Sequence, residues 1–180
     1  MTQPQHPSDV QDSERFRIPL NPDETLLICA PNEIFHIEDA ASSIRQIADK
    51  GSDSKEVRTS IINDLRMRQK VARATLANEF IRQPNAAHKL NKSYNFLTDC
   101  LVHTAWMLVT KVLHPLTVPT KGECLSVLAV GGYGRGEMAP HSDVDLLFLT
   151  PYKQTPWSES VIESMLYILW DLKLKIGHAS

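Results

Sequence analysis

Two aspartates separated by one residue, Asp143 and Asp145, are the side chains best suited to chemistry in this 180-residue chain. They begin an apolar run over residues 143–149 that predicts a strand. Because side chains alternate along a strand, both carboxylates project from one face, about 7 Å apart at Cα. Carboxylates this close repel each other, and Mg²⁺ would supply the missing charge and bridge to substrate phosphates. We therefore expect Asp143 and Asp145 to be catalytic residues and magnesium ligands.

The segment before the aspartates is rich in glycine. Four of the chain's seven glycines lie between Gly131 and Gly136, directly after an apolar run. Glycine lets the backbone turn sharply and lets N–H groups approach an anion, so we expect Gly131 and Gly132 to cradle a phosphate. A tight turn without a ligand would use the same residues. The spacing excludes the dinucleotide fingerprint, because Glu137 stands where its third glycine would fall, and the Walker pattern, because no Gly-Lys-Ser/Thr follows.

The other polar residues of this loop each have two possible roles. Arg135 could bind a triphosphate oxygen or pair with Glu137, and we favour a phosphate-binding or structural role in the active site. Ser142 could donate to a phosphate or cap the turn before the strand, and the sequence does not separate these roles. We expect Tyr133 to pack under the loop rather than contact a nucleotide. We expect His141 to be a solvated turn residue rather than a proton-transfer group.

Helices are expected to fill most of the chain before the glycine-rich segment. Asp53 and Glu56 form a capping-box pattern that would open the longest helix, and Pro84 would end it. Basic and acidic residues alternate along this helix, so we interpret the basic ones as its solvated side rather than an anion-binding face. Apolar residues recur at three- and four-residue steps over residues 32–50, 53–83 and 86–113.

Two strands and one more helix are expected after Gly122. The apolar runs 124–130 and 143–149 have little helical periodicity and predict largely buried strands. Helical spacing returns over residues 158–175, and Gly177 would end that helix. Two strands make no independently stable sheet, so the order indicates an α/β (α+β) fold that belongs to a longer protein.

Composition and charge limit the classes of function. The chain is 42% hydrophobic and 22% charged, with a net charge of −2, which fits a globular domain and argues against a surface that grips nucleic acid. The three cysteines lack disulfide or zinc spacing. No run approaches the roughly 18 apolar residues of a membrane span, and the N-terminus lacks the pattern of a secretory signal. We therefore expect a cytoplasmic protein with no nucleic-acid or membrane partner.

Three segments resemble the nucleotidyltransferase domain of the bacterial PII uridylyltransferase/uridylyl-removing enzyme family: Gly131 to Asp145, Leu169-Trp170-Asp171-Leu172 and Gly177-His178. That domain belongs to the polymerase-β-like superfamily, whose pattern is an apolar residue, Gly-Gly or Gly-Ser, a gap and then Asp-x-Asp. The similarity covers residues 122–180. It implies a helical N-terminal lead-in followed by a partial polymerase-β-like nucleotidyltransferase fold.

The resemblance also implies an activity, which is magnesium-dependent transfer of UMP from UTP to a tyrosine of the PII signalling protein. Glutamine would be the nitrogen signal sensed by the full-length enzyme. By position, Gly131 and Gly132 would hold the triphosphate, and Asp143 and Asp145 would ligate magnesium. Such enzymes add a third carboxylate from a later strand, an HD hydrolase domain that removes UMP, and ACT domains that sense glutamine. These 180 residues hold none of them, so we expect an N-terminal fragment with an incomplete site.

Three regions follow from these patterns: a flexible tail over residues 1–24, a helical region over 25–120 and the first part of a nucleotidyltransferase domain over 121–180. Two alternatives stay open. A nucleotidyltransferase of the antibiotic-modifying type shares the glycine loop and the Asp-x-Asp pattern. A non-catalytic nucleotide-binding or PII-binding fragment would keep the ligands without turnover. The sequence Gly-Gly-Tyr-Gly-Arg-Gly-Glu favours the uridylyltransferase, whereas the preference for UTP rests on the resemblance.

Overall fold

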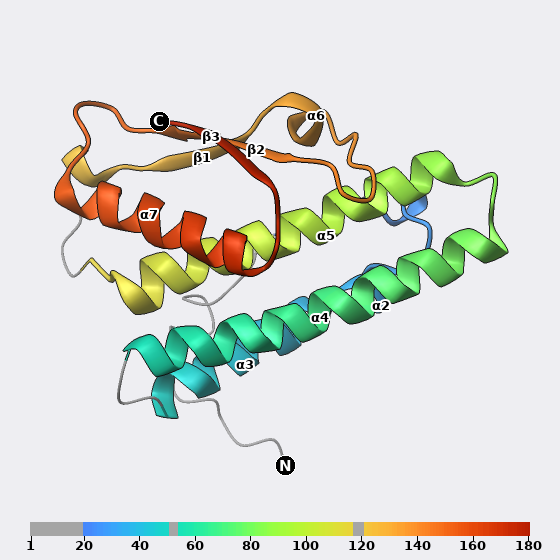
Figure 1. Ribbon diagram of the computed structural model, residues 1–180, viewed down its shortest axis with the longest axis horizontal. Helices are drawn as coiled ribbons and strands as arrows, with labels where there is room; N and C mark the ends of the chain where they lie inside the picture. Colours follow the sequence, from blue (N-terminus) through green and yellow to red (C-terminus); the bar gives the residue numbers. More distant parts are fainter. Residues whose placement is uncertain (1–19, 51–53, 117–120) are drawn as a thin grey trace, which may run out of the picture.

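A three-stranded sheet covers two helices, and the other long helices lie beneath these (Figure 1). This computed structural model describes residues 20–50, 54–116 and 121–180. The helical elements are η1 (Glu24–Leu26), α2 (Pro31–Ile34), α3 (Ile37–Lys50), α4 (Ser54–Arg82), α5 (Ala87–Leu108), η2 (Val109–Leu113), η3 (Lys121–Glu123), α6 (Gly131–Gly134) and α7 (Pro156–Asp171). The strands are β1 (Ser126–Ala129), β2 (Val144–Leu149) and β3 (Ile176–Ala179).

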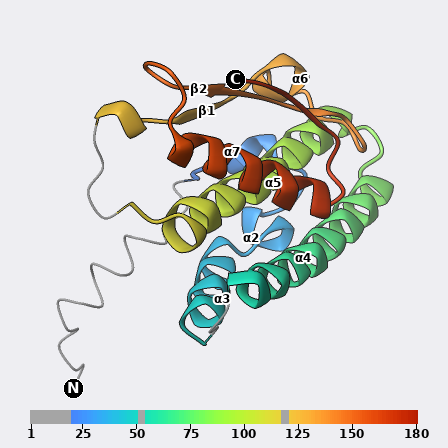
Figure 2. The same cartoon turned by 60° about the vertical axis from the view of Figure 1, so that its left-hand side comes forward.

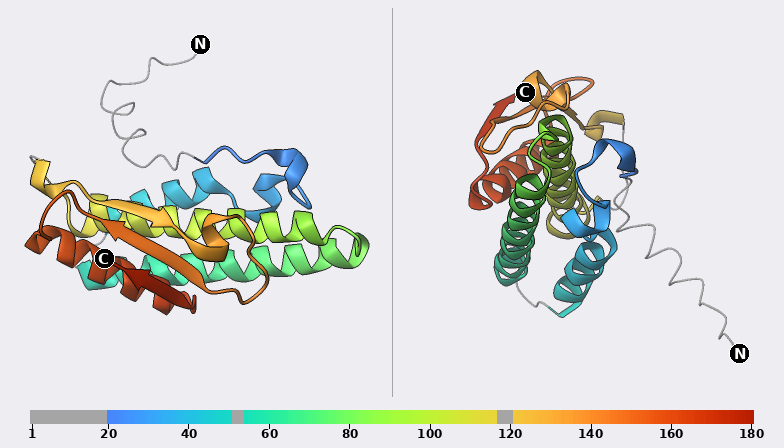
Figure 3. Two further views of the ribbon diagram at one scale, coloured as in Figure 1. Left: turned by 90° about the horizontal axis from the view of Figure 1, so that it is seen from above. Right: turned by 90° about the vertical axis from the view of Figure 1, so that its right-hand side faces the viewer.

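The sheet has the order β1-β2-β3, with β2 in the centre. Strand β1 runs antiparallel to β2, and β3 runs parallel to it, so that Asp145 pairs with Gly177. Helices α5 and α7 pack together under the sheet, and α4 packs against α5 on the side away from the strands (Figure 3). Figure 2 shows α3 and α4 side by side below α5. The α/β class expected from the sequence is confirmed.

Strand β2 alternates as its sequence predicts. Val144, Leu146 and Phe148 are no more than 2% exposed and face the helices, which leaves Asp145 and Leu147 on the opposite face. Strand β1 corrects the expectation of a largely buried strand, because Leu128 is 39% exposed and only Val127 is partly buried. The reason is that β1 is an edge strand whose outer face is not covered by any other described element.

The predicted helices form, with two corrections at their ends. The helix expected over residues 32–50 breaks at buried Phe35, whose backbone is extended (φ −154°, ψ 119°). The helix expected over 86–113 forms as α5 and ends in one π-helical turn, η2. The helix α4 ends just before Pro84 as expected, whereas the capping box at Asp53 lies outside the described residues.

The last helix ends about one turn earlier than the sequence predicts. Helix α7 ends at Asp171 instead of continuing to Lys175. Lys173 adopts a left-handed backbone (φ 60°) that stops the helix, and Leu172 and Leu174 on either side of it are both buried. Gly177 therefore does not end a helix but lies inside β3, a strand that the sequence analysis did not predict.

One hydrophobic core joins the helical region to the sheet. Most of the predicted tail, residues 1–19, lies outside the described residues, and Asp23 at its end caps η1 by accepting a hydrogen bond from the Thr25 N–H.

The segment Ala87–Leu113 is long and apolar enough to cross a membrane, but 61% of its most apolar window is buried within the protein. We therefore interpret α5 as a core helix. The core includes Leu27 and Ile28, Ile61 and Leu65 of α4, Leu101 of α5, Leu146 of β2 and Ile168 of α7.

Candidate active site

The carboxylate of Asp145 is enclosed by two glycines. A Cβ atom added at Gly131 would collide with Asp145 Oδ2, and one added at Gly177 would collide with Asp145 Oδ1. The two glycines therefore leave the space that the carboxylate fills. Among the described residues, no hydrogen-bond donor and no cation is paired with this carboxylate. An unpaired carboxylate in a confined position is suited to bind a cation.

Asp143 lies at the entrance of β2, on the same side of the strand as Asp145. The buried side chain of Val144 between them fixes this arrangement, since neighbours of a buried strand residue point the other way. The Asp143 side chain is 66% exposed, and its Oδ1 lies 3.9 Å from Lys175 Nζ. Lys175 was not singled out in the sequence, and its main-chain oxygen also accepts a hydrogen bond of 2.7 Å from the Val144 N–H.

The glycine-rich segment forms a one-turn helix, α6, beside β2. Gly131 has φ +60°, a conformation that side chains other than glycine rarely adopt. The N–H of Val130 donates to the Asp145 main-chain oxygen at 3.0 Å, and this bond ties the turn to β2. The N–H groups of Gly131 and Gly132 have no acceptor among the described residues. Both are therefore free to bind an anion.

Two candidate phosphate ligands make local contacts instead. Arg135 Nε donates to Glu137 Oε2 at 2.9 Å, and both side chains are mostly exposed. Ser142 Oγ accepts a hydrogen bond of 2.9 Å from the Ala139 N–H, which is the turn-capping role. His141 is exposed in the same turn, with φ 71°. These contacts are compatible with either role of Arg135 and Ser142 once a nucleotide binds.

Tyr133 packs under the loop, as the sequence analysis expected. Its ring is 4% exposed, and its hydroxyl donates a hydrogen bond of 2.8 Å to Asp99 Oδ1 on α5. Burial raises the pKa of Asp99, while the hydrogen bond from Tyr133, the nearby His103 and the hydrogen bond from Asn95 lower it by less. Sequence reasoning missed Asp99, because one acid on a mostly apolar helix carries no signal of its partner.

The charged residues of α4 have more specific partners than expected. Arg58 Nη2 donates to Asp171 Oδ2 at 3.0 Å, and Arg66 Nε donates to the Asp171 main-chain oxygen at 2.9 Å. These contacts fasten the end of α7 to α4. Glu159 and Glu163 are exposed on α7, as expected for surface residues of a helix.

The two aspartates fit a magnesium ion by the chemistry of their donors. Hard divalent cations bind carboxylate oxygens, and Mg²⁺ usually combines one or two carboxylates with phosphate oxygens and water. The unpaired carboxylate of Asp145, with Asp143 on the same strand face, matches that pattern. Within the described ranges, no group of three His, Cys, Asp or Glu side chains is arranged to hold a metal. A nucleotide would therefore have to supply several of the ligands.

Comparison with known proteins first defines the class. Residues 118–176 match the family model of the nucleotidyltransferase domain, which spans the glycine turn, both aspartates and the start of β3. This part of the chain is a nucleotidyltransferase domain. No solved structure matches the chain.

The particular family follows from curated relatives, each named bifunctional uridylyltransferase/uridylyl-removing enzyme. The chain is 56% identical to that of Ruegeria pomeroyi over 76% of its length, and 52% identical to that of Cereibacter sphaeroides over 71%. It is 40% identical to that of Rhodospirillum rubrum over 80% of its length. The chain belongs to this family of transferases. It spans 15%, 14% and 15% of the length of these three relatives.

Proposed function

We propose that this chain is part of a magnesium-dependent uridylyltransferase that transfers UMP from UTP to a tyrosine of the PII signalling protein. The observation that carries the proposal is the unpaired carboxylate of Asp145, enclosed by Gly131 and Gly177 beside a turn with free N–H groups. The names of the relatives support uridylyl transfer. We further propose a cytoplasmic enzyme whose full-length form responds to glutamine.

In the proposed reaction, the tyrosine oxygen attacks the α-phosphorus of UTP. The bond from that phosphorus to pyrophosphate breaks, the hydroxyl proton is released, and UMP remains on the tyrosine. The N–H groups of Gly131 and Gly132 hold the triphosphate, with Arg135 and Ser142 as further phosphate ligands. Asp143 and Asp145 ligate magnesium, which when bound neutralises phosphate charge and lowers the pKa of the attacking hydroxyl. Holding both reactants in line accounts for much of the rate enhancement.

A labelling assay with the full-length protein tests this function. UTP or ATP, labelled in the α-phosphate, is incubated with the enzyme and PII at low and high glutamine, with and without EDTA. We expect label from UTP on PII, little label from ATP, a dependence on glutamine, and no label in EDTA. Preferential labelling by ATP, or transfer to a small molecule instead of PII, would contradict the proposal.

A further inference from the structure

The side chain of Tyr133 connects the glycine turn to the helical region. Three of the four residues of α6 are glycines, so Tyr133 is the one residue of this turn with a side chain that can anchor it. Its ring is buried, and its hydroxyl donates to Asp99 Oδ1 at 2.8 Å. The position of α6 therefore depends on what holds Tyr133.

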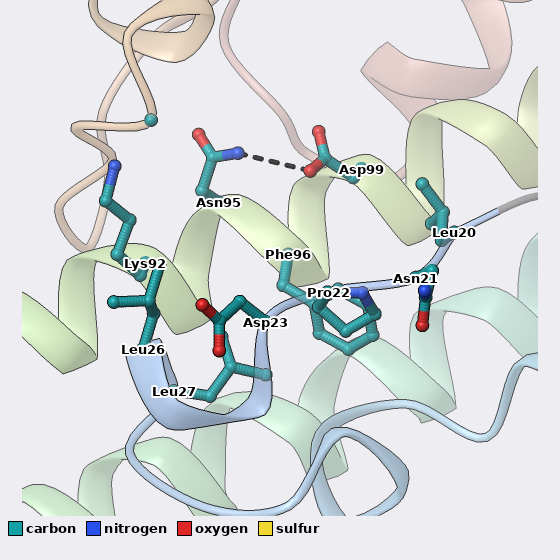
Figure 4. Close-up of a pocket in the computed structure, with 11 residues that line it drawn as sticks. Leu20, Asn21, Pro22, Asp23, Leu26, Leu27, Lys92, Asn95, Phe96 and Asp99 are labelled. Carbon is teal, nitrogen blue, oxygen red and sulfur yellow. Dashed lines mark hydrogen bonds between the residues drawn. The ribbon is translucent and has the colours of Figure 1, made fainter.

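Asp99 is itself held from the other side. Asn95, one turn earlier on α5, donates from Nδ2 to Asp99 Oδ2 at 3.1 Å, as Figure 4 shows. Both residues line a cavity of about 220 Å³. The far wall of this cavity includes Asp23 and Leu27. With one oxygen bound to Asn95 and the other to Tyr133, the carboxylate has a fixed direction. It therefore fixes where the Tyr133 hydroxyl lies.

Stability alone does not account for a carboxylate at this place. Withdrawing a charged group from water is costly, and burial raises the pKa of Asp99 despite its hydrogen bonds. This cost is offset by a strong directional hydrogen bond from the Tyr133 hydroxyl, because hydrogen bonds to a charged acceptor are stronger than those between neutral groups. A fixed position of the turn matters most where a ligand must fit.

The turn faces the candidate metal ligand directly. Gly131 lies against the carboxylate of Asp145, and the Val130 N–H donates to the main chain of the same residue. A shift of Tyr133 would move Gly131 relative to Asp145. Lys92 Nζ, 3.5 Å from the Arg135 main-chain oxygen, is a second contact from α5 to the loop.

We propose that Asp99 is a positioning residue for nucleotidyl transfer, which through Tyr133 holds the glycine turn at the spacing from Asp145 that a metal-bound triphosphate requires. This inference rests on the proposed function for its substrate, whereas the attachment of the turn to α5 is a property of the chain itself. The two can therefore be tested separately.

The kinetic test uses the full-length enzyme and the variants Asp99→Asn, Tyr133→Phe and the double variant. Thr104→Val is the matched control, because Thr104 is buried on the same helix and its hydroxyl bonds, among the residues that the structure describes, only to the Cys100 carbonyl. We expect each single variant to raise the KM for Mg-UTP about tenfold, the effect of one charge-assisted hydrogen bond, with a smaller change in kcat. The double variant should be no worse than the worse single one, since both act through one contact. Additive effects, or an unchanged KM in both single variants, would overturn the proposal.

Hydrogen exchange gives a readout that needs no substrate. The N–H groups of Gly134, Arg135 and Gly136 are bonded within the turn. We expect them to exchange faster in Asp99→Asn and Tyr133→Phe than in the parent or in Thr104→Val. If exchange responds but the parent enzyme transfers no UMP, the proposed function fails and the attachment of the turn stands. Equal exchange in all four proteins would overturn the inference.

Discussion

Gly177 on β3 lies so close to Asp145 on β2 that Asp145 Oδ1 occupies the place where a side chain at position 177 would begin. The parallel register of the two strands pairs these residues directly. Gly131 has the same relationship to the other carboxylate oxygen. Backbone on both sides, rather than side chains, thus encloses the candidate metal ligand.

Replacement of Gly177 by alanine should weaken ligand binding at this site while leaving the stability of the fold almost unchanged. The atom in the way is the end of a side chain that can rotate, so we expect the free energy of unfolding to change by less than about 1 kcal/mol. The displaced carboxylate should weaken Mg-dependent UTP binding about tenfold, the lower range for loss of metal-ligand orientation. Chemical unfolding and UTP titration of Gly177→Ala measure the two effects. Unchanged UTP binding would show that the position of Asp145 does not matter.

Gly134→Ala is the contrasting variant, because here the added Cβ would meet backbone atoms instead of a side chain. An added Cβ would lie 2.5 Å from the main-chain oxygen of Ala129 and 2.9 Å from its carbonyl carbon. Backbone atoms cannot rotate away, so we expect a loss of about 1–3 kcal/mol in unfolding free energy, as for other overpacked sites. A variant as stable as the parent would contradict the described packing of α6 on β1.

The ion pair between Arg58 and Asp171 should contribute little to stability. The two side chains are 35% and 43% exposed, and the N···O distance is 3.0 Å. We expect Asp171→Asn to lower the free energy of unfolding by about 0.2–1 kcal/mol at low salt and by less in high salt. Urea unfolding at two salt concentrations measures this, with Glu163→Gln, which removes an exposed acid of α7, as the control. If the loss of unfolding free energy does not change with salt, packing and hydrogen bonds, rather than charge, hold α7 to α4.

The three cysteines should react with alkylating reagents in a fixed order. Cys124 is exposed, Cys29 is partly buried, and Cys100 is buried. Burial, with smaller contributions from Glu33 and Glu79, raises the pKa of Cys29 to about 11, and burial also raises that of Cys100. Because the thiolate is the reactive form, we expect modification of Cys124 first, then Cys29, and of Cys100 only on unfolding. Peptide mass spectrometry after timed alkylation measures the order, and early labelling of Cys100 would contradict the fold.

His103 should make stability depend on pH near neutrality. Burial lowers its pKa below 6.5, and the charge of Asp99 only partly offsets this. The folded state then binds fewer protons than the unfolded state. The stability contributed by neutral His103 is therefore complete above about pH 6.5, and it is lost as the pH falls below that value towards the lowered pKa of the folded state. His103→Gln should flatten the pH dependence of the melting temperature between about pH 5 and 7. The exposed His88→Gln is the control, and an equal slope in the parent and His103→Gln would refute the assignment.

The sequence predicted the local elements of this molecule better than it predicted the long-range contacts between them. The alternation of Val144, Leu146 and Phe148 correctly gave the buried face of β2. The end of α7 was missed because no glycine or proline lies between Asp171 and Gly177, and the left-handed conformation that stops the helix falls on Lys173. The exposure of β1 was missed because apolar composition does not tell whether a strand has a second covering layer.

The site was predictable only where its residues are close in the sequence. Gly131, Gly132, Asp143 and Asp145 form one readable motif, and their proposed roles remain predictions. Gly177 lies 32 residues beyond Asp145 in the numbering and becomes its neighbour only through strand pairing. Asp99 lies 34 residues before Tyr133, and no local pattern links them. Tertiary pairing, not composition, brings both to the site.

Binding of UTP by the full-length enzyme, with and without Mg²⁺, tests the central claim most directly. Titrations compare the parent with Asp143→Asn, Asp145→Asn and the control Glu159→Gln, whose acid is exposed on α7. Our account predicts that the parent and Glu159→Gln bind UTP only with Mg²⁺, and that each aspartate variant binds Mg-UTP more than about tenfold more weakly. Binding of Mg-UTP by both aspartate variants as tightly as by the parent would contradict it.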